Sequence, residues 1–342
     1  MPKGGEKCGN RQGKPPPGVS EKPVLLPKTD YNTPGKVVRM GSAGPGTIDL
    51  KQGGDFNSAI VSQAGAVLGT VTLSQEGSGN GATLTQTDTF EEAYLLQSGQ
   101  RNRATVGQTA GTGGEAGLQP QRVADLIQSG DNNGLTLTQQ TGNGNLTTVQ
   151  QSGDFNYAAL NQASHSNEIS LTQLGNTNYA RLDQTATGGK VILEQSGDGN
   201  DTRVTQRTGS DNQASIGQAG TGERADLEQD GSFNTAELTQ SGSIQLARVD
   251  QNGNGNETSL TQAGGGHQAA VTLLGNDNTA LLGQDGNGNH LDFNLSGDAN
   301  SVSLTQTGSA NTLVFDVQAN DFSLSLQQGG TGNTLTVLKV VP

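Results

Sequence analysis

Apolar and polar positions alternate along most of this chain, in a pattern that repeats about every 11 residues. From Gly46 onward, four alternate positions form a unit. The first slot is usually Asn, the second is Ala, Thr or a larger apolar residue, the third is always apolar, and the fourth is usually Gln. Twenty-six such units can be placed, and 21 of the 25 intervals between unit starts are 11 residues. The first unit is Gly46-Ile48-Leu50-Gln52 and the last is Asn333-Leu335-Val337-Lys339.

This alternation predicts β-strands, because successive side chains of a strand point to opposite faces. A helical period of 3.6 residues would scatter the four slots around the axis. Between the units lie turn sequences such as Asp285-Gly286-Asn287-Gly288, in which Gly and Asn or Asp can supply positive-φ conformations. Each unit is therefore a strand of about seven residues followed by a turn of about four.

A module of two strands and two turns cannot bury its apolar face alone, so it must stack on its neighbours. Two units make one rung, and 26 units predict 13 rungs. The predicted fold class is all-β: a β-solenoid of two facing, parallel, in-register sheets of cross-β, amyloid-like character. Ala, Leu and Val fill the space between the sheets.

The inward Asn and Gln residues need a hydrogen-bonding partner, because a buried unpaired amide costs about 1–3 kcal/mol. In a stack, the same amide recurs one rung above and below, so each amide can donate to one neighbour and accept from the other. An alternative is that these residues merely mark polar turns, but Gln fills the fourth slot in 22 of 26 units. The predicted amide ladders contain Gln75, Asn80, Gln86, Gln97, Asn102, Gln108, Gln151, Asn156, Gln162, Gln173, Asn178, Gln184, Gln229, Asn234 and Gln240.

Composition separates an N-terminal arm from the repeats. Residues 1–45 hold eight of the ten prolines and eight Lys or Arg against three Asp or Glu, so the arm carries +5 and the remainder −18 of the total −13. Such a basic, Pro-rich arm is expected to be a flexible, disordered leader, or a solvated tail without a role. The predicted domains are the leader at 1–45, the solenoid at 46–339 with an insertion loop at 109–121, and a C-terminal tail at 340–342.

The repeats resemble curlin repeats, which build bacterial curli fibres and share the pattern Gln-x-Gly-x-x-Asn-x-Ala-x-x-x-Gln. Five copies follow this pattern, among them Gln75-Gly77-Asn80-Ala82-Gln86 and Gln229-Gly231-Asn234-Ala236-Gln240. The resemblance covers residues 46–339. It implies an extracellular, cell-surface amyloid fibre that serves biofilm matrix and cell adhesion, with self-polymerisation, a nucleator subunit and outer-membrane secretion machinery as partners. No secretory signal is recognisable at the N-terminus, which lacks an apolar run.

Other classes of protein find little support. His165, His267 and His290 are scattered, and the carboxylates lie in turns or outward slots, so no enzyme, cofactor or metal site is expected. The single cysteine, Cys8, excludes an intramolecular disulfide. No apolar run is long enough to span a membrane, and nucleic acid is an unsuitable partner for an acidic body.

The two ends of the stack are the predicted assembly edges. An open solenoid ends in unpaired strand edges that can template another chain. These edges carry Ile48, Leu50 and Gln52 at one end and Leu335 and Val337 at the other. Head-to-tail stacking through them predicts a fibre subunit. The alternative is a monomeric solenoid that acts as a surface adhesin or a ligand-binding or ice-binding module.

Overall fold

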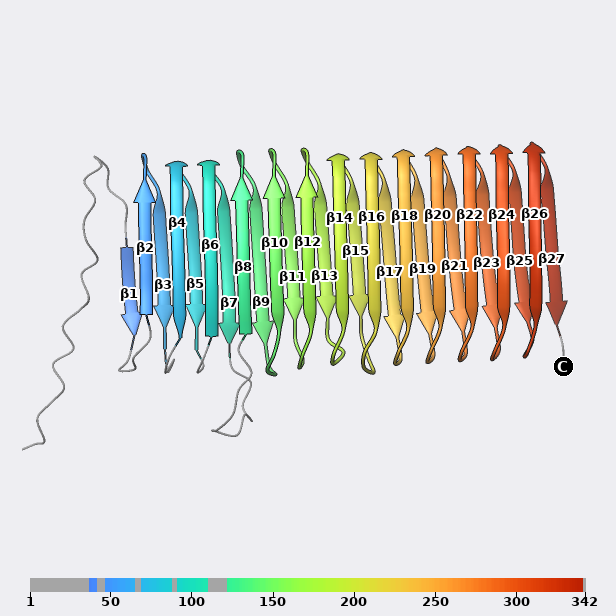
Figure 1. Ribbon diagram of the computed structural model, residues 1–342, viewed down its shortest axis with the longest axis horizontal. Helices are drawn as coiled ribbons and strands as arrows, with labels where there is room; N and C mark the ends of the chain where they lie inside the picture. Colours follow the sequence, from blue (N-terminus) through green and yellow to red (C-terminus); the bar gives the residue numbers. More distant parts are fainter. Residues whose placement is uncertain (1–36, 42–46, 65–68, 88–90, 110–121, 341–342) are drawn as a thin grey trace, which may run out of the picture.

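The protein forms a long, flat column of strands stacked along one axis (Figure 1). The computed structural model describes residues 37–41, 47–64, 69–87, 91–109 and 122–340, and within 37–41 only the backbone. Every regular element in these ranges is a strand, and successive strands alternate between two sheets. The predicted all-β solenoid of two parallel sheets is confirmed.

One sheet has 14 strands, here called sheet A. In order, these are β1 (Val37–Gly41), β3 (Ser58–Gln63), β5 (Gly81–Gln86), β7 (Arg103–Thr109), β9 (Gly134–Gln140), β11 (Tyr157–Gln162), β13 (Tyr179–Gln184), β15 (Asp201–Gln206), β17 (Arg224–Asp230), β19 (Leu246–Asn252), β21 (Gln268–Leu274), β23 (His290–Ser296), β25 (Thr312–Gln318) and β27 (Thr334–Val340).

The facing sheet has 13 strands, here called sheet B. In order, these are β2 (Thr47–Gly53), β4 (Thr70–Ser78), β6 (Glu91–Gln100), β8 (Arg122–Ser129), β10 (Leu146–Ser152), β12 (Glu168–Leu174), β14 (Lys190–Asp198), β16 (Gln213–Thr221), β18 (Thr235–Ser243), β20 (Glu257–Gly265), β22 (Thr279–Asn287), β24 (Ser301–Ser309) and β26 (Ser323–Thr331).

Neighbouring strands pair in parallel and in register, so that equivalent slots of successive rungs form straight columns. Leu160 lies beside Leu182 in sheet A, and Val149 lies beside Leu171 in sheet B. The second and third slots supply one continuous apolar core between the sheets. The alternating side chains of the same strands remain partly or fully exposed, as the sequence pattern predicts.

The turns depend on glycine where two backbones approach closely. Gly175 has φ +107°, and a Cβ added there would lie 2.2 Å from the carbonyl oxygen of Gly197 on the next rung. The turn position before the first slot also takes positive φ, and here the residue type is not restricted to Gly, Asn and Asp. Phe155 (φ 58°) and Ile244 (φ 54°) occupy it with exposed side chains. The turn conformation is thus imposed by the stack, whose backbone hydrogen bonds run from turn to turn, as from Phe155 N to Asp131 O at 3.0 Å.

The predicted start and end of the repeat region can be compared with the strands of the structure. The 26 predicted units correspond to β2 through β27. The additional strand β1 lies within residues 1–45, the segment expected to be a flexible leader. It pairs with β3, Val37 lying beside Ala59 and Gly41 beside Gln63. The sequence of β1 lacks the Asn and Gln slots, so the repeat pattern did not reveal it. Most of the predicted leader, most of the insertion and the end of the tail lie outside the described residues.

No helix among the described residues is long and apolar enough to cross a membrane.

Candidate functional site: amide columns and strand edges

The glutamines of the fourth slot form two unbroken hydrogen-bonded columns, one in each sheet. In sheet B, Gln75 Nε2 donates to Gln97 Oε1 at 2.8 Å, and the same contact joins Gln151 to Gln173. Residues 11 positions apart in the sequence, such as Gln75 and Gln86, lie in opposite sheets and do not bond to each other. Each glutamine instead donates to the one a full rung further on, about 22 residues away.

The same contact recurs at every other glutamine expected in the ladders. In sheet A, the donor and acceptor pairs are Gln86 with Gln108, Gln162 with Gln184 and Gln229 with Gln251, and in sheet B Gln240 donates to Gln262. Each amide also donates to a backbone carbonyl, as Gln173 does to Tyr157 O at 3.2 Å. A column of this kind leaves no buried amide unsatisfied and penalises a register slip, because one displaced strand interrupts it.

The asparagines of the first slot form columns of a different kind. Asn80 Oδ1 accepts from the backbone N–H of Asn102 at 2.9 Å, and Asn80 Nδ2 donates to the carbonyl oxygens of Glu76 and Gly99 at 3.0 Å each. The equivalent contact joins Asn156 and Asn178. The short asparagine side chain thus binds the backbone of its own turn and of the next rung. Among the described residues, side-chain to side-chain bonds between first-slot asparagines occur only toward the C-terminal end of sheet B, as from Asn300 to Asn278 at 2.9 Å. The expectation that asparagines pair with each other as glutamines do is therefore wrong for most of the chain.

Buried threonines in the second slot attach one sheet to the glutamine column of the other. Thr147 of β10 accepts from Gln139 at 3.2 Å and donates to Gln162 at 2.8 Å. Thr202 makes the corresponding contacts with Gln195 and Gln218. The sequence analysis grouped these threonines with the apolar residues of the second slot. A hydroxyl in an inward slot could have indicated a hydrogen bond to the buried glutamines.

The four fourth slots that lack Gln stack directly on one another. Leu273, Leu295, Val317 and Lys339 occupy β21, β23, β25 and β27, and the first three are completely buried. Beside them, Phe293 and Phe315 stack with ring centroids 4.7 Å apart. The glutamine column of sheet A therefore ends at Gln251, whose Nε2 donates to Thr258 Oγ1 at 3.0 Å. An apolar column continues from Leu273 to Val317, and Lys339 follows it in the last strand.

Three consecutive first slots of sheet A also depart from asparagine: Glu223, Gln245 and His267, all buried. Gln245 Nε2 and His267 Nε2 reach carbonyl oxygens four residues earlier, at 2.9 and 3.0 Å. Glu223 has no amide to donate, and neither carboxylate oxygen makes a well-formed hydrogen bond within the described chain. Burial raises the pKa of Glu223 to about 7, and the nearby backbone of Ala219 and Gly242 offsets only part of that rise.

The predicted assembly edges lie at the two ends of the sheets. Ile48 and Leu50 of β2 and Leu335 and Val337 of β27 are only partly buried, unlike the same slots inside the stack. Gln52 of β2 donates to Gln75 at 2.6 Å. At the other end Lys339 Nζ lies 4.1 Å from the centre of the Phe322 ring, a cation–π contact across the last rung.

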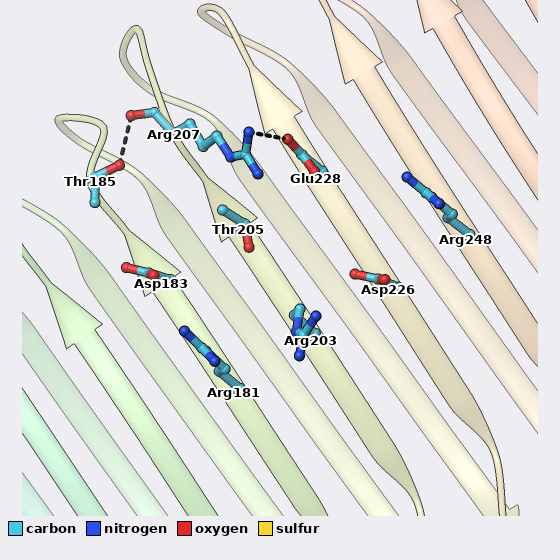
Figure 2. Close-up of a pocket in the computed structure, with 9 residues that line it drawn as sticks. All are labelled: Arg181, Asp183, Thr185, Arg203, Thr205, Arg207, Asp226, Glu228 and Arg248. Carbon is cyan, nitrogen blue, oxygen red and sulfur yellow. Dashed lines mark hydrogen bonds and ion pairs between the residues drawn. The ribbon is translucent and has the colours of Figure 1, made fainter.

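The outer face of sheet A carries a shallow polar hollow between β13 and β19 (Figure 2). Arg207 Nη1 lies 2.9 Å from Glu228 Oε1, and the Thr185 hydroxyl donates to the Arg207 carbonyl oxygen at 2.7 Å. Asp226 stands in register between Arg203 and Arg248. Opposite charges alternate here on exposed side chains, which stabilise the sheet only slightly. Among the described residues no group of three or more His, Cys, Asp or Glu could hold a metal ion.

Comparison with known proteins supports one family. No curated protein matches the chain. Five segments match the curlin associated repeat, at residues 142–175, 165–206, 190–220, 231–264 and 253–286. These segments contain the first and fourth slots of β10 through β16 and of β18 through β22 described above. The columns and the matched segments together show that this chain contains curlin associated repeats.

Proposed function

We propose that this protein is the structural subunit of an extracellular curli-type amyloid fibre, which grows by head-to-tail stacking of solenoids. The observation that carries the proposal is the match between the two ends of sheet B. β26 ends the sheet with Leu324, Leu326 and Gln328, and β2 begins it with Ile48, Leu50 and Gln52, in the same slots. The apolar residues at both ends are only partly buried, so stacking would remove them from water.

The hydrogen-bonding groups at these ends are also complementary. Gln328 Nε2 donates to the backbone of Thr312 and Asn333, because no further glutamine follows it among the described residues. At the opposite end the described residues place no donor against Gln52 Oε1. A second copy would continue the column with the same contact that joins every rung inside the molecule. Strand edges such as those of β2 and β26, beyond which no described strand lies in sheet B, favour polymerisation.

The family supports the wider role. Curlin repeats imply an extracellular structural protein, and we propose that this fibre acts in cell adhesion and biofilm matrix, with no enzymatic activity. Its partners are further copies of itself, together with a nucleator subunit and outer-membrane secretion machinery. The division into a leader at 1–45 and a solenoid at 46–339 belongs to the same proposal, and β1 (Val37–Gly41) lies within the leader.

The test is a thioflavin-T time course on protein released from denaturant, followed by electron microscopy and fibre diffraction. We expect a lag and then fibres with reflections at roughly 4.8 and 10 Å. Val337→Lys places a charge in the inward slot of the last strand and should prevent growth. Thr336→Lys, on the outward face of the same strand, is its matched control and should assemble normally. A wild-type protein that stays a soluble β-rich monomer for days would favour the adhesin or ligand-binding alternative, and fibres from Val337→Lys would exclude this mode of stacking.

A further inference from the structure

The strands of the two sheets differ in number by one. β2 through β27 form 13 complete rungs, each with one strand in either sheet, whereas β1 adds a fourteenth strand to sheet A alone. Sheet B ends at β2, and no described strand lies beyond it. β1 is therefore a half-rung at the N-terminal end of the column, and it is drawn there beside β2 and β3 in Figure 1.

Burial at this end shows the effect of the half-rung. Ala59 and Val61 of β3, the strand that β1 covers, are 0% and 1% exposed. Ile48 and Leu50 of β2, which has no strand beyond it, are partly exposed. The edge of sheet A is thus closed while the edge of sheet B is open.

A half-rung is incompatible with continuous head-to-tail stacking. Suppose that a second copy docks with its β1 in place. In sheet A, its β1 would then lie between β27 of the first copy and its own β3, which adds one level to sheet A. Sheet B has no strand to fill that level between β26 of the first copy and β2 of the second. That level of sheet B would contain no strand, and the backbone groups of β26 and β2 that face the gap would lack partners. With β1 released, β2 and β3 of the second copy follow β26 and β27 directly, and both sheets are continuous.

The register of β1 shows why a second copy can replace it. Arg39 occupies the register position of Val61, and Gly41 that of Gln63. β1 therefore extends the backbone ladder of sheet A without extending its sequence pattern of apolar and Gln slots. In the stacked arrangement, Leu335 and Val337 of β27 would instead stand over Ala59 and Val61.

From these observations we propose that β1 is a detachable strand that occupies the docking edge of β3 and delays polymerisation until a second copy displaces it. The inference rests on the proposed function, since β1 would regulate when the same joint between fibre subunits forms. The partner that this edge fits is the C-terminal rung, β26 and β27, of another copy of the chain. Exchange of one parallel strand for another keeps the parallel backbone pairing of β3 and adds the apolar slots of β27. In sheet B, Gln328 of β26 then continues the glutamine column to Gln52 of β2.

A reversible cross-link between β1 and β3 tests the inference in the full-length chain. Val38 and Ile60 are register partners, and parallel partners lie about 4.8 Å apart, within the range that a disulfide spans. The variant is Cys8→Ser, Val38→Cys, Ile60→Cys, and Cys8→Ser alone is the control. With the cross-link closed we expect the lag before fibre growth to lengthen at least about tenfold, because the edge stays occupied. Reduction should restore the lag of the control.

A second variant tests the inference without a cross-link, in case the cross-linked protein folds poorly. Val38→Pro with Met40→Pro removes two backbone donors from β1 and leaves residues 47–340 unchanged, so it should shorten the lag. Equal lags for the oxidised, reduced and proline variants, with the cross-link verified by mass spectrometry, would overturn the inference and leave the proposed function standing. Absence of fibres from the Cys8→Ser control and from the reduced protein would instead overturn the proposed function and this inference with it.

Discussion

The guanidinium of Arg122 lies 2.7 Å from the carboxylate of Glu91, Nη1 to Oε1, with the two side chains 3% and 1% exposed. The residues are register partners in the first slots of β8 and β6. Arg122 Nε and Nη2 also donate to the Gly142 carbonyl oxygen at 2.9 and 2.7 Å. Arg122 follows residues 110–121, where the regular spacing of the units is interrupted. The ion pair thus takes the place of the asparagine column where the chain returns to sheet B.

We expect Arg122→Ala to destabilise this part of the solenoid by about 3–5 kcal/mol, because it leaves a buried carboxylate without its main counter-charge. The double variant Glu91→Asn, Arg122→Asn should recover most of the loss, since Asn fills 17 of the 26 first slots. Arg103→Ala, at an exposed position of β7, is the control. The measurements are the urea midpoint of freshly desalted monomer and the hydrogen exchange of β6 and β8. A loss in Arg122→Ala no larger than in the control would contradict this role.

Glu223 predicts a stability that depends on pH. The unfolded chain loses this proton near pH 4.5, whereas burial in the fold raises the pKa to about 7. The folded state therefore binds the proton more tightly, and stability falls as pH rises from about 4.5 to 7, by about 3 kcal/mol in total. Above pH 7 the full penalty remains.

Glu223→Gln should remove this pH dependence and raise the urea midpoint at pH 7.5. The reason is that an amide can donate to backbone carbonyls from this slot, as Gln245 does one rung away. Glu237→Gln, an exposed carboxylate of β18, should leave the pH profile as it is in the wild type. Identical profiles for wild type and Glu223→Gln between pH 4.5 and 7.5 would refute the assignment.

The glutamine column of sheet A allows a comparison of two identical substitutions. Gln206→Leu interrupts the column, so that Gln184 loses its side-chain acceptor and Gln229 its donor. We expect a loss of about 1–3 kcal/mol. Gln251→Leu lengthens the existing apolar column by one rung. It removes the acceptor of Gln229 and the donor to Thr258 Oγ1, but no glutamine beyond it loses a donor, so its cost should be smaller. Urea denaturation of both variants measures the difference, and equal losses would indicate that the continuity of the column does not matter.

Much of this architecture could be predicted from the sequence, because a repeated rule determines it. The inward slots, the parallel register and the glutamine ladders all follow from the 11-residue period. The stacking of Leu273, Leu295 and Val317 also had a signal, since they are 22 residues apart. The asparagine contacts had no such signal in the sequence, because they depend on the distance between a short side chain and the turn backbone. β1 could not be predicted either, since a single strand with Arg39 and Gly41 at the register positions of Val61 and Gln63 has no repeat to reveal it.

The turn glycines give the last prediction, because the absence of a Cβ allows the rungs to stack closely. Gly175 has φ +107°, and an added Cβ would meet the Gly197 carbonyl oxygen at 2.2 Å. Gly175→Ala should therefore cost about 3 kcal/mol or more, since both the backbone conformation and the spacing of the rungs must change. Gly217 lies in β16 with nothing within 4 Å of an added Cβ. Gly217→Ala should be neutral or stabilise by about 0.4–1 kcal/mol through the unfolded chain. Urea midpoints and protease resistance of the two monomers distinguish these outcomes, and a Gly175→Ala protein as stable as Gly217→Ala would mean that the turns can separate without loss.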